Sequence, residues 1–480
     1  MKMNVIYTVF VRIQTKEGTF AALVSDLDRI RALGTDAVCL TPIFRTVPEY
    51  QWDLQPNPYD VLDQREISGE YGSMEDFQNL VEEIHRRGMK CILEVVTASL
   101  SKASPLFKEH PEYFVYEKPE QGRFSMEKLL DRFHVTYDEF VAETNLTEED
   151  FNGEWENDSV RTEMLPLDYG NPALRAYQVD TLLYWSRLVD GFRCVASYQT
   201  PLAFWKEAWA AVRREKPDFL WIGETCDCSQ NAVFRWEGWG KKSDSDSPSA
   251  VSNAAGDSDL PPAVLDSASA ADLFSTFDLV SDDALYPRFR YTLRGKIALS
   301  QYLDLLNLQE TAYPTGYHML RYWERLEHSR LASPVRERVM LENFTAFLYF
   351  LKGTVQLYVG QEWSWTYGPS LTWSGLLPKR RYDLGDLMHR LWEIRRDFLR
   401  DSDTFHAVGN DGNSIVCAER SDGGSRKIGV FSLEGKEAEV EVFVPDGKYT
   451  NLIDGTPVVV KDRKLSCDGR PVIITLPVQE

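Results

Sequence analysis

The chain has 480 residues, of which 43% are hydrophobic and 12% aromatic, enough to bury a large core and to form more than one domain. Its formal net charge of −21 at pH 7 would repel a phosphate backbone or an anionic membrane surface, so we expect neither nucleic acid nor a membrane as partner. No stretch approaches the roughly 18 apolar residues that a membrane span needs. The first residues also lack the apolar segment and the cleavage site of a signal peptide.

The cysteines fit a reduced, intracellular protein. There are seven of them, and Cys39, Cys91 and Cys194 lie singly on apolar, strand-like segments. This is typical of core residues in a cytoplasmic protein. Cys226 and Cys228 lie close together, but neither a second cysteine pair nor a histidine cluster accompanies them, so the spacing does not favour a zinc site. We therefore expect a cytoplasmic protein with no metal ion and no organic cofactor.

From the N-terminus, apolar strand-like segments alternate with amphipathic helical ones. Strands are predicted at 5–11, 36–44, 90–96, 190–196 and 218–225. Helices are predicted at 23–34, ended by Gly34, at 73–88, capped by Ser73 and ended by Gly88, and at 173–189 and 201–216. Nearly continuous apolar strands separated by helices predict a parallel sheet covered by helices, and this many units favour a closed barrel.

Three segments depart from this alternation. Residues 97–165 are aromatic, acidic and irregular, which predicts a small domain inserted after the third strand. Residues 241–272 are rich in Ser, Asp, Ala and Pro, which predicts a disordered acidic loop. Over 398–480 the periodicity changes to two, with Gly, Asp and Asn turns, which predicts a C-terminal antiparallel β-sandwich. The barrel would then comprise residues 1–96 and 166–397.

Four stretches carry a family resemblance. NPYDVLDQREISGEYGSMEDFQNLVEEIHRRGMKCILEVV (57–96) is similar to the first half of an α-amylase-type glycoside hydrolase. LPLDYGNPALRAYQVDTLLYWSRLVDGFRC (165–194) resembles that family's approach to its G-F-R-x-D strand, which carries the nucleophile. DFLWIGET (218–225) resembles the strand with the general acid, and GTVQLYVGQEW (353–363) resembles the last barrel strand. The resemblance covers roughly residues 1 to 400, and the C-terminal β-domain matches the family's usual one.

The resemblance implies a fold and a chemistry. The fold is a (β/α)8 TIM barrel with an inserted B domain after strand 3 and an active site at the C-terminal face of the barrel. Members are retaining enzymes of α-1,4-glucosidic bonds: one carboxylate attacks the anomeric carbon and another protonates the leaving oxygen. A third carboxylate binds the sugar hydroxyls. The implied ligands are α-glucans and maltooligosaccharides.

The nucleophile is missing from this sequence. Its position, two residues after Arg193, is occupied by Val195, which can neither attack a sugar nor stabilise an oxocarbenium ion. A shifted alignment does not restore it, because Ala196, Ser197 and Tyr198 follow. The acid/base position matches Glu224 and is intact.

The third acid belongs to an N-H-D motif, which is altered here. The best match places it over Arg325, Leu326 and Glu327, so that Glu327 keeps a carboxylate at the position of the transition-state stabiliser. A competing alignment starts the motif at Asn343, but that segment reads better as the following helix.

The first motif of the family, D-x-V-x-N-H, is also altered. It becomes Glu94, Val96, Ala98 and Ser99. Ala98 and Ser99 replace a calcium ligand and a sugar contact, so we expect no calcium there.

Four further residues are candidates for binding the substrate. Tyr59 and Arg193 match the family's sugar-stacking tyrosine and the arginine that orients its nucleophile, and Trp52 could stack on a sugar. Arg193 is expected to pair with Glu224 or Glu327, because a buried arginine without a carboxylate is costly. Asp227 could reach the cleft as a base, whereas Asp190 lies too early on its strand. Trp363 and Trp365 read more readily as packing residues than as sugar contacts.

Three functions follow from these residues. The favoured one is a catalytically inactive α-amylase-family protein that still binds α-glucan or maltooligosaccharide in its cleft. An active hydrolase or transglycosidase stays open, with Glu224 as acid/base and Asp227 or Glu327 as substitute carboxylate. A protein-interaction scaffold also stays open, with the 241–272 loop docking a protein partner.

Overall fold

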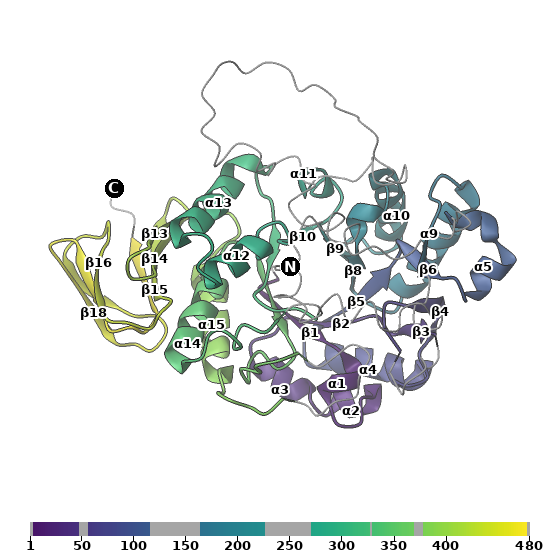
Figure 1. The fold of residues 1–480 in the computed structure, drawn as a ribbon, viewed down its shortest axis with the longest axis horizontal. Coiled ribbons are helices and arrows are strands. Elements are labelled where there is room, and N and C mark those ends of the chain that lie inside the picture. The colour runs from purple at the N-terminus through teal and green to yellow at the C-terminus, as the bar shows by residue number, and fades with distance from the viewer. Residues whose placement is uncertain are drawn as a thin grey trace, which may run out of the picture.

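The computed structural model describes residues 3–47, 56–115, 164–225, 270–326, 329–368 and 378–477. Within them, parallel strands close into a barrel (Figure 1), which confirms the predicted fold class. In spatial order the barrel strands are β1 (Val5–Val9), β2 (Ala37–Leu40), β5 (Lys90–Val96), β8 (Gly191–Val195), β9 (Leu220–Gly223), β10 (Leu279–Ser281), β11 (Met319–Arg321) and β12 (Thr354–Tyr358), after which β12 pairs with β1.

The register of the strands sets which side chains meet at the barrel mouth. The neighbours β5 and β8 are paired so that Glu94 lies opposite Arg193 and Val96 lies opposite Val195. On the other side of β8, Cys194 lies opposite Gly223, the residue before Glu224. Because side chains alternate along a strand, Glu94 and Arg193 point to the same face.

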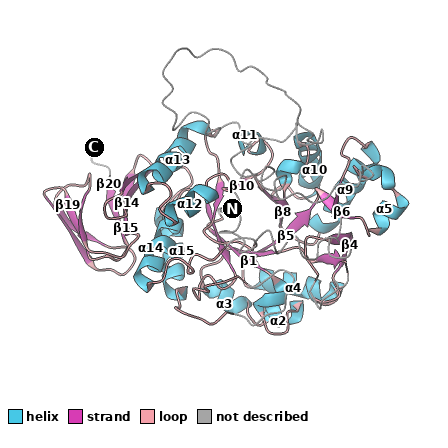
Figure 2. Cartoon of the chain, in the orientation of Figure 1, coloured by secondary structure: helices cyan, strands magenta, loops and turns pink. Residues whose placement is uncertain are grey.

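Helices cover the outside of the barrel, as Figure 2 shows. They are α1 (Val11–Gln14), α2 (Phe20–Val24), α3 (Leu27–Ala32), α4 (Met74–Arg86), α9 (Pro172–Ser186), α10 (Leu202–Glu215), α11 (Ala270–Leu273), α12 (Tyr286–Leu293), α13 (Leu299–Ala312), α14 (Arg338–Phe350) and α15 (Gly385–Phe398). The predicted cap of α4 is present: the Ser73 hydroxyl accepts from the Asp76 N–H at 3.1 Å, and the Asp76 carboxylate accepts from the Ser73 N–H at 2.8 Å.

The single helix predicted over 23–34 is wrong, because the structure has the two short helices α2 and α3 there. The Ser25 hydroxyl donates to the Ala22 carbonyl at 2.6 Å, at the end of α2. The next residue, Asp26, directly precedes α3 and accepts from Arg29 at 2.6 Å. Short polar side chains that bond locally in this way compete with the helical backbone pattern.

Part of the predicted inserted domain is described. Strand β6 (Ser99–Ser101) pairs with β7 (Met164–Pro166), and between them in the chain lie α5 (Pro105–Glu109) and a turn of 3₁₀-helix at Pro111–Tyr113. A second two-stranded sheet joins β3 (Phe44–Thr46) to β4 (Val61–Ile67). Residues 116–163 of this domain and 241–269 of the predicted acidic loop lie outside the described residues.

The C-terminal residues form antiparallel sheets, as the period-two pattern predicts. One has the order β13 (Thr404–Asn410), β14 (Ile415–Ser421), β15 (Ser425–Ser432) and β20 (Val472–Pro477). The other has the order β16 (Ala438–Glu441), β19 (Lys464–Cys467), β18 (Pro457–Lys461) and β17 (Gly447–Thr450). A separate apolar cluster of valines, leucines and isoleucines fills the space between them.

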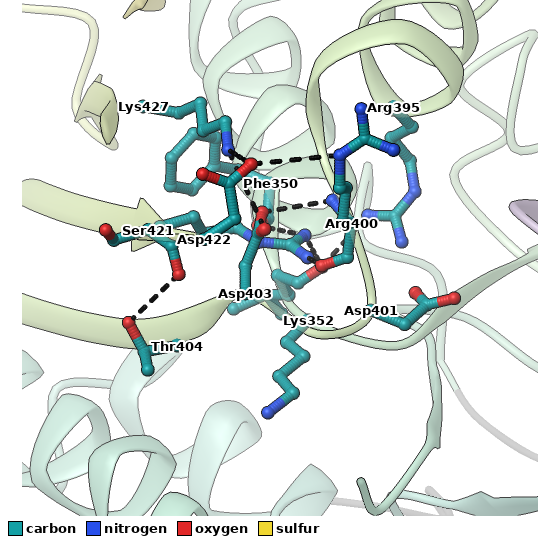
Figure 3. Close-up of polar contacts among 12 residues, drawn as sticks. Phe350, Lys352, Arg395, Arg400, Asp401, Asp403, Thr404, Ser421, Asp422 and Lys427 are labelled. Atoms are coloured by element: carbon teal, nitrogen blue, oxygen red, sulfur yellow. Dashed lines mark hydrogen bonds and ion pairs between the residues drawn. The ribbon is translucent and has the colours of Figure 1, made fainter. Parts of the chain in front are cut away.

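A buried polar cluster joins these sheets to the barrel helices (Figure 3). Arg395 of α15 donates to the Leu351 carbonyl at 2.9 Å, and Arg420 of β14 donates to the same carbonyl at 3.2 Å. Asp403 lies 3.2 Å from the Arg420 guanidinium and 3.7 Å from the Lys427 ammonium. The carbonyls at the end of α14 thus find their donors in both parts of the chain.

Across the described residues, no helix is both long and apolar enough to cross a membrane.

Candidate active site

A small pocket lies where the barrel strands end at their carboxyl side. It is lined by Thr8, Thr41, Tyr59, Glu94, Arg193, Val195, Glu224, Arg325, Leu326 and Gln356. The space in it open to the centre of a water molecule is about 10 Å³, and on that measure one water needs about 10–15 Å³. The enclosed part of the pocket is therefore too small for a sugar ring.

Val195 ends β8 and lines the pocket, where the family has its nucleophile. The next residue, Ala196, has a left-handed backbone with φ of 49°, which is unfavourable for a residue with a Cβ. This conformation aims the Ala196 N–H at the Glu224 carboxylate, 2.6 Å away.

Arg193 lies between two glutamates. One Nη donates to Glu94 and the other to Glu224 Oε1 at 3.0 Å. The exposed fractions of the three side chains are 7%, 1% and 8%, so both ion pairs are buried. The ion pair predicted between Arg193 and Glu224 is therefore present, and Glu94 is a second partner that the sequence did not indicate.

Hydrogen bonds fix both the side chain and the backbone of Glu224. Its Oε1 also accepts from Arg325 Nη1 at 2.9 Å. The Ser197 hydroxyl fixes its backbone, because it accepts from the Glu224 N–H and donates to the Glu224 carbonyl, both at 2.7 Å. Burial alone would raise the pKa of Glu224, but Arg325 and Arg193 outweigh it and lower the pKa.

Asp283 is a site residue that sequence reasoning missed. It follows β10 and accepts from Arg325 Nη1 at 2.6 Å, from the Thr225 N–H at 3.0 Å and from the Tyr322 hydroxyl. Burial raises its pKa to about 6. The available signal was its place directly after an apolar strand-like segment, where barrel enzymes display functional groups.

Tyr59 lies at the pocket beside Glu94. Its hydroxyl donates to Glu94 Oε2 at 3.0 Å, so both oxygens of Glu94 are engaged, one by Tyr59 and one by Arg193. Burial is the main cause that raises the pKa of Glu94. Tyr59 and Arg193 thus come together with Glu224, as the resemblance implies, whereas Trp52, Asp227 and Glu327 lie outside the described residues.

Asn343 and Asp190, two residues weighed in the sequence analysis, both lie away from the pocket. Asn343 is fully buried in α14, where it donates to the Gly469 carbonyl and accepts from the Ser432 N–H, each at 2.8 Å, so it does not belong to the pocket. Asp190 accepts from His85 at 2.7 Å and from the Cys91 N–H at 2.8 Å, next to the residue that starts β8, at the opposite end of this strand from Val195.

Trp363 and Trp365 pack in the core. Their exposed fractions are 9% and 2%. The Arg29 and Arg380 guanidinium carbons lie 4.4 and 4.1 Å from the centroid of the Trp363 ring, and such cation–π contacts occupy its faces. Their interpretation as packing residues is confirmed.

Comparison with known proteins supports the fold. Residues 8–253 match the family described as Alpha amylase, catalytic domain, and residues 407–474 match Bacterial Alpha amylase C-terminal domain. An α-amylase from Lactobacillus plantarum of known crystal structure is 28% identical, with a TM-score of 0.79 over 98% of each chain.

Two curated relatives have similar identity. Alpha-amylase 3 of Dictyoglomus thermophilum is 28% identical over 363 residues, which are 70% of this chain and 67% of that protein. Alpha-amylase MalA of Haloarcula japonica is 27% identical over 225 residues, which are 46% of this chain and only 29% of that protein. Since the catalytic-domain match alone spans just over half of the 480 residues, this chain belongs to the α-amylase family.

Proposed function

We propose that this α-amylase-family protein binds α-glucan or maltooligosaccharide and does not hydrolyse it. The observation that supports this most directly is the set of ion pairs around Glu224. A retaining glycosidase needs two carboxyl groups about 5–5.5 Å apart that face the scissile bond, one of them able to give a proton. Here Val195 stands at the position of one, and the other is bound to Arg193, Arg325 and the Ala196 N–H.

The protonation state of Glu224 supports the same proposal. A general acid in a glycosidase has a raised pKa, so that it carries its proton near neutral pH. The two arginines lower the pKa of Glu224 instead, which keeps this carboxyl ionised and unable to donate. Its Oε1 already accepts from both arginines and its Oε2 from the Ala196 N–H, so each oxygen is engaged by a donor of the protein.

The described carboxylates do not replace the nucleophile. Glu94 is bound by Arg193 and Tyr59, and Asp283 is bound by Thr225, Tyr322 and Arg325. A nucleophilic role would require each of them to give up these partners. Asp227 and Glu327 are the substitutes left for a working enzyme, and they are tested below.

Binding of α-glucan is supported by the family and by one retained contact. The family's members act on α-glucans, and the curated relatives carry the name α-amylase. Tyr59 keeps its place in the wall of the pocket and is partly exposed, so its ring can stack on a sugar that lies at the mouth of the pocket rather than inside it.

The test is release of nitrophenol from an activated α-maltoside by the wild-type protein, Glu224→Gln and Val195→Asp, beside calorimetric titration with maltoheptaose. We expect wild type and Glu224→Gln to stay at background while wild type binds maltoheptaose. Turnover by wild type that is lost in Glu224→Gln would show a working enzyme, and Asp227→Asn and Glu327→Gln would then identify its second carboxylate. Absence of both turnover and binding would contradict the glucan-binding half of the proposal.

A further inference from the structure

Arg325 is a largely buried cation that lies between two carboxylates at the mouth of the barrel. It follows β11 by four residues and reaches across the barrel mouth to two carboxylates, Glu224 at 2.9 Å and Asp283 at 2.6 Å. Its side chain is 16% exposed, so it is largely surrounded by protein. The Tyr322 ring lies 5.7 Å from its guanidinium carbon and stacks in turn on Tyr286, which fixes the direction of approach.

The guanidinium fills the place beside Glu224 Oε1 that a substrate oxygen would need. A glycosidic oxygen that reacts with an acid must come within about 2.6–3.2 Å of the carboxyl. At Glu224 Oε1 that place is filled by Arg325 Nη1 and Arg193 Nη2. Leu326, beside Arg325, lines the same pocket with an apolar side chain, and the remaining room is about one water.

We propose that Arg325 is a built-in plug that closes the innermost sugar position, next to Glu224, and restricts α-glucan to positions outside it. The inference rests on the proposed function, since it names which part of that binding site is closed. The proposed absence of hydrolysis then has two independent causes. One is the loss of the nucleophile at Val195, and the other is the occupation of the sugar position by Arg325.

The charges explain why the plug stays in place. Glu94, Glu224 and Asp283 share the two cations Arg193 and Arg325. Removal of Arg325 alone would leave two buried carboxylates with one arginine fewer, which is costly. The double variant Arg325→Asn with Asp283→Asn removes one charge of each sign, so the balance of the cluster is unchanged.

The test is calorimetric titration with maltotriose, a ligand too short to gain much from outer positions. The proteins compared are wild type, Arg325→Ala, Arg325→Asn with Asp283→Asn, and the control Arg338→Ala. Arg338 forms an exposed ion pair with Glu342 on α14, so its removal changes charge equally without touching the pocket. We expect at least tenfold tighter binding, or about 1.4 kcal/mol, in the two plug variants and no change in the control.

The outcomes separate this inference from the proposed function. If circular dichroism shows the double variant folded and its maltotriose affinity is within twofold of wild type, the plug is overturned, whatever wild type does with maltoheptaose. If wild type binds no glucan but the plug variants do, the plug stands and the glucan-binding proposal fails. If Arg325→Ala is unstable, the double variant alone decides.

Discussion

At the scale of single residues, the site is a cluster of charges that neutralise one another. Glu224 and Asp283 both bind the same Nη1 of Arg325, so their titrations are linked. The pKa of Glu224 is lowered by the arginines, while burial raises the pKa of Asp283 to about 6. Asp283 therefore takes up a proton before Glu224 does as the pH falls through about 6.

This assignment predicts a pH-dependent stability. An unfolded aspartate has a pKa of about 3.9, so between about pH 4 and 6 the folded protein holds a proton at Asp283 that the unfolded chain has released. The contribution of Asp283 to stability is thus fully present below about pH 4 and is lost as pH rises through 6. We expect Asp283→Asn to reduce this slope, by about 1–3 kcal/mol in all, in urea unfolding followed between pH 4 and 7. Glu94, whose pKa burial also raises, contributes a slope of the same sign that remains in the variant.

The pKa of Glu224 is shifted in the opposite direction from that of Asp283, so the effect of Glu224 on stability serves as an internal control. Its pKa is lowered, so its contribution is present at neutral pH and is lost as pH falls below the ordinary glutamate value of about 4. The two windows therefore differ. A slope above pH 4 that is as steep in Asp283→Asn as in wild type would contradict the assignment.

At the scale of elements, the loop after β8 holds Glu224 through its backbone. Ser197 is fully buried, exchanges two hydrogen bonds with Glu224, and its carbonyl accepts from the Trp205 indole at 2.9 Å. Through these three hydrogen bonds, Ser197 connects the end of β8 with the end of β9 and with the start of α10.

Ser197→Ala should therefore be destabilising. It leaves the buried Glu224 N–H without its acceptor, which costs about 1–3 kcal/mol. Chemical denaturation measures the loss. Ser466→Ala, at an exposed position of β19, is the matched control and should stay within about 0.5 kcal/mol of wild type. Equal stability of the two variants would mean that the Ser197 hydroxyl is not needed to hold the loop.

Elements were predictable from the sequence where one periodicity dominates, as in the capped helix α4 and the strand β5. The break between α2 and α3 was not, since it depends on where the Ser25 hydroxyl bonds. The lost nucleophile at Val195 and the retained Glu224 were visible as residue types. The role of Arg325 was not, because its partner Asp283 lies 42 residues away in the chain and meets it only when the barrel closes.

At the scale of the whole molecule, the barrel and the C-terminal sheets are joined by buried polar groups rather than by apolar contact alone. Figure 1 shows α13, α14 and α15 between them. The Arg420 and Asp403 side chains are both 0% exposed, and Arg420 donates to backbone carbonyls at the end of α14. Such a joint is specific, because these ion pairs and hydrogen bonds form only in the docked arrangement.

Arg420→Ala should uncouple the two parts. It removes the nearer of the two cations beside the buried Asp403 and one of the donors to the carbonyls at the end of α14, at a cost of about 3–5 kcal/mol. We expect calorimetry to show one unfolding transition for wild type and two for the variant. Arg470→Ala, which removes an exposed ion pair with Asp468, should keep a single transition. A single transition at the wild-type temperature in Arg420→Ala would show that the joint does not depend on this arginine.

The closure of the barrel through β1 has a consequence for how the protein can be handled. β1 pairs with β2 on one side and with β12 on the other, so the barrel sheet has no open edge there. A chain shortened past Val9 would leave β2 and β12 with rows of unpaired backbone groups, which are templates for pairing with another molecule. Such a shortened protein is expected to aggregate, so an affinity tag replacing these few residues would be more harmful than a long extension added before them.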